Sequence, residues 1–187
     1  MPILAAEPDH FPPELFASES SIDDLTLGNW WLVYTRSRKE KEMMRRLHAA
    51  QVAFYGPMIH RRSRSPSGRV RESHVPLFPG YVFLFGDEDA RRTALQTNCV
   101  STISAVQDGV QLVSELASLV HLLASDRVVL PEQRLEPGVK VRVTSGPLRG
   151  QEGTVIERRG KRRLMVAINL LQLGASVVLD ECDVQPL

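Results

Sequence analysis

Apolar and polar positions before residue 125 follow two different periods, which predicts a mixture of strands and helices. Residues 30–35 and 77–85 are rich in aromatic and β-branched side chains, which favours strands. Within residues 38–51, Met43, Leu47 and Ala50 recur at helical spacing. The other elements expected here are a strand at 52–59 broken by Gly56-Pro57, a loop at 61–71, a helix at 87–97, a strand at 100–104, and a helix from Ser114 with the apolar stripe Leu116, Leu119, Val120 and Leu123.

After residue 137 the pattern changes to short alternating segments separated by turn residues. Strands are expected at 139–143, 153–156, 164–168 and 176–179. Their spacing predicts a small β-barrel, filled by Val141, Val143, Val155 and Ile168. Residues 125–137 lose periodicity and contain Pro131 and Pro137, so they are interpreted as a linker.

The segment 77–85 contains the most informative pattern of the chain. Successive side chains of a strand point to opposite faces, so Tyr81, Phe83 and Phe85 share one face while Val82 and Leu84 share the other. Both faces are apolar and both must be covered. One is expected to form the core, and the other to be covered by the protein's own elements or by a partner.

Residues 1–28 differ from the rest of the chain in charge and in pattern. The first 29 residues hold six Asp or Glu and no Lys or Arg, and residues 1–28 include four prolines. This composition predicts a disordered acidic tail, in which Phe11, Leu15 and Phe16 can still dock elsewhere. The net charge of the whole chain is only +1. Residues 30–75, however, hold eleven Lys or Arg against three acids, so local basic patches govern contact with polyanions.

No motif in the sequence indicates catalysis. A P-loop, a Gly-x-Ser-x-Gly elbow and zinc-ligand spacing are all absent, so no enzyme activity, no cofactor and no metal are expected. Cys99 and Cys182 are interpreted as buried thiols rather than a disulfide. The chain has neither a long apolar run nor a signal pattern, which predicts a cytoplasmic protein without membrane contact.

Two motifs resemble those of one known family. Residues 138–155, with the turn Gly146-Pro147 and with Gly150 and Gly153, closely resemble a KOW motif. Upstream, residues 30–34, a basic helix, residues 56–58 and residues 76–83 occur in the order found in the NGN domain of the NusG family. The resemblance implies an α+β protein. An NGN α/β sandwich with a mainly antiparallel sheet is expected at 29–124, and an SH3-like KOW barrel at 138–187.

By this resemblance the chain is a monomeric transcription elongation or antitermination factor. The NGN domain would bind the β′ clamp helices of RNA polymerase and suppress pausing or termination. The resemblance implies that Phe78, Pro79, Tyr81 and Phe83 contact the clamp helices, that Arg91, Arg92 and Thr93 face the β subunit, that Arg36, Arg38, Lys39, Arg45 and Arg46 face upstream or non-template DNA, and that Leu148, Ile168, Leu170, Leu171 and Leu173 bind a ribosomal or termination partner of the KOW domain.

The sequence departs from the general NusG pattern at two places. Leu148 follows Gly146-Pro147 where general NusG proteins have Phe, and residues 169–179 replace their Phe-Gly-Arg and Pro-Val-Glu-Leu stretch. These differences, with residues 57–59 and 78–85, favour a specialised RfaH-like paralogue and weigh against Rho as a partner. The glycines of the C-terminal segment favour a barrel over the helical hairpin that RfaH can form.

One alternative class remains open, namely a KOW-type RNA-binding or ribosome-associated protein. The basic run 158–163 is equally consistent with a phosphate-contacting turn and with a solvated one. Aromatic side chains that stack on RNA bases are usually interleaved with basic residues. Tyr81, Phe83 and Phe85 have only aliphatic neighbours, which favours a protein groove as their partner.

Overall fold

A computed structural model describes residues 8–16, 25–64, 68, 70–125, 127–158, 160–179 and 184–187. Its contacts divide the chain into two compact units, Met1–Gly109 and Val110–Leu187. Each unit has its own sheet, and each is described separately below.

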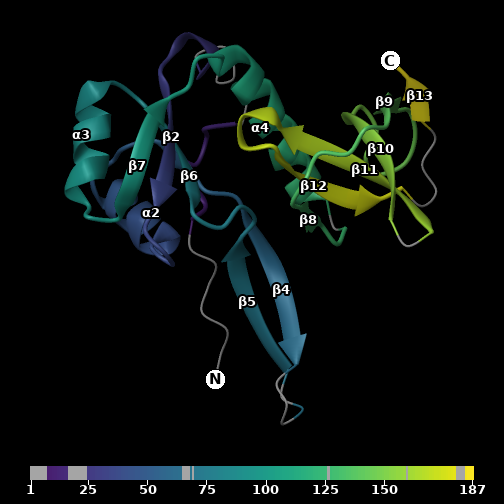
Figure 1. Cartoon of the computed structure of the whole chain (residues 1–187), viewed down its shortest axis with the longest axis horizontal. Helices are drawn as coiled ribbons and strands as arrows, with labels where there is room; N and C mark the ends of the chain where they lie inside the picture. The colour runs from purple at the N-terminus through teal and green to yellow at the C-terminus, as the bar shows by residue number, and fades with distance from the viewer. Residues whose placement is uncertain are drawn as a thin grey trace. The chain divides into compact units, whose positions relative to one another are not determined.

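The first unit is built on a five-stranded sheet in the order β1-β3-β6-β2-β7, with every neighbouring pair antiparallel. Two helices supply the apolar side chains that cover one face of this sheet (Figure 1). The elements are β1 (His10–Phe11), β2 (Trp30–Thr35), α2 (Glu40–Ala49), β3 (Phe54–Tyr55), β6 (Tyr81–Phe85), α3 (Glu88–Gln96) and β7 (Val100–Ala105).

The core of the first unit lies between this sheet and its helices. Its fully buried members are Val33, Met43, Met44, Leu47, Phe54, Val82, Leu84, Ala94 and Cys99. Two residues of the predicted helical stripe, Met43 and Leu47, are buried in this core, whereas the third, Ala50, is exposed and follows the end of α2. Of the two apolar faces of the aromatic strand, the one that carries Val82 and Leu84 forms the core. Cys99 is a buried free thiol, as expected, while Cys182 lies outside the described residues.

A separate hairpin, β4 (Met58–Arg64) with β5 (Val70–Pro76), projects from the first sheet as a two-stranded arm (Figure 1). The sequence predicts a loop at 61–71, but strand pairing extends to Arg64 opposite Val70. Polar residues such as Arg61, Ser73 and Glu72 occupy this ladder. A two-stranded arm without a core face has no apolar alternation that the sequence could display.

Part of the segment interpreted as a disordered tail is folded. Residues His10–Phe11 form β1, which pairs with β3, and Leu15 is buried. Leu15 and the aromatic residues near it provide the apolar anchors, and an open sheet edge provides the hydrogen bonds. Composition alone therefore misjudged residues 8–16. The rest of the predicted tail up to residue 24 lies outside the described residues.

The second unit contains α4 (Gly109–Ala124) and a six-stranded antiparallel sheet in the order β13-β9-β10-β11-β12-β8. Its strands are β8 (Leu130–Glu132), β9 (Val139–Val143), β10 (Glu152–Arg158), β11 (Lys161–Ile168), β12 (Leu173–Val178) and β13 (Val184–Pro186), with the 3-10 turn η1 (Asn169–Leu171). Val141, Val143 and Ile168 are buried as predicted, and Val155 is half-buried. The pairing among described residues does not join β13 to β8, so the SH3-like barrel stays a prediction.

Two features of the second unit differ from the sequence interpretation. Helix α4 begins at Gly109, five residues before the predicted start at Ser114, and its buried stripe includes Leu112 and Val113. The predicted linker contains β8, which pairs with β12. Pro131 within β8 is compatible with its place at the end of the described sheet, because an edge strand can lack a ladder donor.

Candidate functional site

The second face of the first sheet is lined by aromatic side chains, and we call it the aromatic face. It is built from three cross-strand pairs of β2 and β6: Trp30 with Phe85, Leu32 with Phe83, and Tyr34 with Tyr81. On the other side of β6, Tyr55 of β3 lies opposite Phe83. Both faces of β6 are therefore apolar in the folded chain, as its alternation predicts.

The four residues predicted to contact the clamp helices differ in exposure. Phe83 is 0% exposed and Phe78 is 2% exposed, so both are core residues in the described chain. Tyr81 is half-buried and Pro79 is exposed. A partner that docks on the described surface can reach only the last two directly.

Tyr34 is a surface residue that the sequence interpretation missed. Its side chain is 47% exposed, and its ring centroid lies 5.2 Å from that of Tyr81. The two tyrosines form the open end of the aromatic face. The signal was available, because Tyr34 follows Trp30 by four residues in one strand and must share its face.

A hydrogen-bonded turn fixes the position of Tyr81. Glu40, at the start of α2, is mostly buried and accepts a hydrogen bond from the Gly80 N–H at 2.7 Å. The Thr35 N–H donates to the Gly80 carbonyl at 2.7 Å, and the Tyr81 N–H donates to the Phe78 carbonyl at 3.1 Å. The turn is thus tied to both β2 and α2, which orients Tyr81 beside Tyr34.

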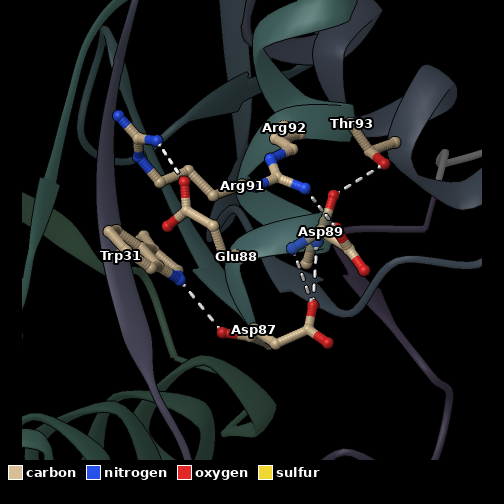
Figure 2. Close-up of polar contacts among 9 residues, drawn as sticks. Trp31, Asp87, Glu88, Asp89, Arg91, Arg92 and Thr93 are labelled. Carbon is tan, nitrogen blue, oxygen red and sulfur yellow. Dashed lines mark hydrogen bonds and ion pairs between the residues drawn. The ribbon is translucent and has the colours of Figure 1, made fainter.

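Helix α3 brings together Arg91, Arg92 and Thr93, the residues predicted to face the β subunit (Figure 2). Asp87 caps this helix by accepting hydrogen bonds from the backbone N–H groups of Asp89 and Ala90. The predicted contact residues therefore lie about one turn after the N-terminus of a helix that has a side-chain N-cap.

Each of these three side chains has an internal partner. Arg91 pairs with Glu88 at 2.5 Å, and its guanidinium lies 5.5 Å from the Trp31 ring centroid. Arg92 pairs with Asp89 at 3.0 Å, and the Thr93 hydroxyl donates to the Asp89 carbonyl at 2.9 Å (Figure 2). Exposed pairs of this kind are weak, so a partner of suitable charge could replace them.

The predicted DNA-facing residues lie at the end of β2 and along α2. Arg36 and Arg38 are exposed in the connection between these elements, and Arg45 and Arg46 are exposed on the helix. Arg46 and Lys39 both contact Glu42, at 2.7 and 2.5 Å. The hydrogen bonds from Lys39 and then Arg46 lower the pKa of Glu42. This surface is basic, with part of its charge internally balanced.

The predicted partner residues of the second unit fall into two groups. Leu148 and Ile168 are buried, whereas Leu170 is 44% exposed. Leu171 and Leu173 are half-buried. The exposed members cluster at η1 and the start of β12, so this turn offers the accessible apolar surface.

Sequence reasoning missed a buried polar network on the second sheet. The Ser176 hydroxyl donates to Glu132 at 2.5 Å and accepts from Arg163 Nε at 2.8 Å, while Arg163 Nη2 donates to the Ser176 carbonyl at 2.8 Å. Burial lowers the pKa of Arg163, and the nearby charge of Glu132 opposes that shift. The network joins β8, β11 and β12. Scattered polar residues in three strands give no local signal of such contacts.

The chain is a mixed α/β protein, in which an antiparallel sheet covered by helices and bearing an aromatic face is followed by a unit of short antiparallel strands. Residues 28–126 match the family model described as transcription termination factor nusG, which covers more than half of the chain. The chain belongs to the NusG family, whose members are transcription factors and not enzymes. Comparison with curated proteins gives no match.

Two properties of the described residues concern membranes and metal ions. Within the part of the chain that is described, no helix is both long and apolar enough to cross a membrane. The same residues contain no cluster of His, Cys, Asp and Glu side chains that could hold a metal ion.

Proposed function

We propose that the chain is a transcription elongation and antitermination factor that binds RNA polymerase through the aromatic face of its first unit. The surface pair formed by exposed Tyr34 and half-buried Tyr81 is the observation that carries this proposal. Tyrosine is enriched among the residues that dominate protein interfaces, because its ring is large and rigid and its hydroxyl tolerates water. The family membership of this domain makes the polymerase the partner to test first.

The neighbouring surfaces support a bound factor that touches several components. Arg91 and Arg92 would exchange their exposed acidic partners for acidic groups of the β subunit. Arg36 and Arg38 would lie against the phosphates of upstream or non-template DNA, since basic side chains position a protein on nucleic acid.

The second unit would recruit a further protein through the turn at η1. Leu170 is exposed, with Leu171 and Leu173 beside it, and a small apolar patch of this kind suits a protein edge. A small-subunit ribosomal protein is the partner that the family resemblance favours. An RfaH-like paralogue with weak or no Rho binding remains the finer proposal.

A second candidate function is RNA binding through the second unit. Lys161 and Arg162 are exposed at the turn between β10 and β11, and neither forms an ion pair among the described residues. Arg158 at the same turn is paired with Glu136 at 2.7 Å. Arg159 of this basic run lies outside the described residues.

The first proposal is tested by binding of the full chain to purified RNA polymerase core. Tyr81→Ala is expected to weaken binding about 30-fold, because a central interface anchor contributes about 2 kcal/mol. Val128→Ala removes an exposed apolar side chain of the second unit and serves as the matched control. A folded Tyr81→Ala variant with unchanged affinity would reject the aromatic face. Failure of the parent chain to bind polymerase, with RNA retained through Lys161 and Arg162, would establish the second candidate.

A further inference from the structure

Residues 8–16 are folded onto the first sheet although the family match begins at residue 28. We call them the N-terminal strap. In the strap, His10 pairs with Tyr55 and Phe11 with Phe54, and the Gly56 N–H donates to the Asp9 carbonyl at 2.7 Å. The strap therefore adds an edge strand to the sheet that bears the aromatic face.

The strap also covers one side of the aromatic face. The Phe16 ring stands edge-on to Tyr55 with ring centroids 5.2 Å apart, and Leu15 is 5% exposed. Tyr55 is 1% exposed and lies opposite Phe83 in the sheet. The strap thus covers the aromatic face along β3, at one side of the surface that the polymerase is proposed to bind.

Residues 25–28 cover the end of the face opposite to the Tyr34–Tyr81 pair. The indole N–H of Trp30 donates to the Leu25 carbonyl at 3.0 Å. A Cβ added to Gly28 would stand 2.2 Å from the Phe85 ring, so the backbone lies directly against that ring. Among the described residues, these contacts leave the Tyr34–Tyr81 end of the face open.

The open end is too small for a stable interface by itself. A protein interface buries about 800 Å² per partner, whereas a tyrosine buries about 150–250 Å² in full. Tyr34 and Tyr81 are already partly covered by their neighbours. A partner that docks over these two tyrosines must therefore bury additional side chains of the aromatic face. The neighbouring side chains on that face are those around Tyr55 and Phe85.

We propose that the N-terminal strap is a displaceable cover that competes with RNA polymerase for the aromatic face. The inference rests on the proposed function of that face and concerns its regulation. The strap is attached by a two-residue strand, by the Gly56–Asp9 hydrogen bond, and by the side chains of Phe11, Leu15 and Phe16. A short edge segment of this kind can open locally without unfolding the rest of the unit. The apparent affinity of the factor would then be reduced by the fraction of molecules with an open strap.

The experiment compares the full chain with Phe16→Ala, with Leu15→Asp as a second variant that opens the strap if alanine does not. Glu14→Ala changes an exposed residue of the same segment and is the control. Two quantities are measured: the affinity for polymerase core, and the hydrogen-exchange protection of the Gly56 amide that bonds to Asp9. If the strap is docked in about nine-tenths of the molecules, opening it tightens polymerase binding about tenfold.

The expected result is lower protection at Gly56 together with tighter polymerase binding in Phe16→Ala or Leu15→Asp, and no change in Glu14→Ala. Lower protection with unchanged or weaker binding would overturn the competition. Unchanged protection in both variants would overturn the attachment through Leu15 and Phe16. Failure of all variants to bind polymerase, with lower protection at Gly56, would place the fault in the proposed function and leave the docked strap in place.

Discussion

The turn that presents Tyr81 gives a prediction whose size follows from the structure. Gly80 has φ +89°, a left-handed conformation that L-residues avoid at about 1–2 kcal/mol per residue. A Cβ at Gly80 would also stand 2.8 Å from Tyr34 Cε2. Because Tyr34 is half exposed, its ring can turn away, and the contact with Tyr81 is lost. An aromatic pair contributes about 0.5–1.5 kcal/mol, so Gly80→Ala is expected to lower the free energy of unfolding by about 1.5–3.5 kcal/mol.

Gly150 supplies the matched control for this prediction. It has φ +86°, and a Cβ there would meet no atom within 4 Å. Gly150→Ala should therefore show the backbone effect alone, about 1–2 kcal/mol. Urea unfolding of Gly80→Ala is followed by the fluorescence of Trp30 and Trp31, which lie in the same strand as Tyr34. Unfolding of Gly150→Ala is followed by circular dichroism. Equal losses in the two variants would refute the reasoning about Tyr34.

Three further predictions concern the buried ring of Phe83, the His10–Asp9 side-chain hydrogen bond and the Ser176 hydroxyl. Phe83→Ala removes a fully buried ring and should lower the free energy of unfolding by about 3–5 kcal/mol in urea denaturation, so a small loss would show that Phe83 is not a core residue. The hydrogen bond with Asp9 raises the pKa of His10, and burial opposes this shift. The protonated His10 therefore stabilises the fold at low pH, and this contribution is lost as pH rises through the raised pKa. An NMR titration of His10 should show a midpoint above 6.5 that falls in Asp9→Asn. Ser176→Ala removes the hydroxyl that accepts from Arg163 Nε and donates to Glu132, and should destabilise the second unit by about 1–3 kcal/mol in calorimetry, with an unchanged transition contradicting the role of the network.

The elements that the sequence predicts well are those whose apolar pattern is long and regular. Helix α2 buries Met43, Met44 and Leu47 at helical spacing, and strands β2 and β6 are built almost wholly of aromatic and β-branched or aliphatic side chains, so both signals are visible in the residues themselves. The existence of a second apolar face on β6 followed from the same alternation.

The missed elements depend on contacts between distant parts of the chain. β1 has only two residues and no period of its own, so it forms because β3 offers an open edge. β8 lies in a proline-containing stretch and is held by Ser176 and Arg158, which contact Glu132 from other strands. The exposure of Tyr81 and the burial of Phe83 likewise depend on what covers the face, which a strand pattern does not reveal.

Helix α4 belongs to the region matched by the family model, but its contacts place it in the second unit. The family match extends to residue 126 and includes α4, yet contacts within the chain assign the helix from Val110 onward to the second unit. Glu115 accepts two hydrogen bonds from Asn169, at 3.0 and 2.5 Å, and Gln151 donates to the Ser118 carbonyl at 3.0 Å.

The family match ends at residue 126, whereas the contacts divide the chain after Gly109. This difference constrains where recombination could divide the chain without breaking contacts. A crossover at residue 126 would separate α4 from Asn169 and Gln151, with which it forms hydrogen bonds. A crossover near Gly109 would keep the helix with the sheet to which it is bonded. In this chain the second unit is therefore a separable part only when α4 is transferred with its sheet.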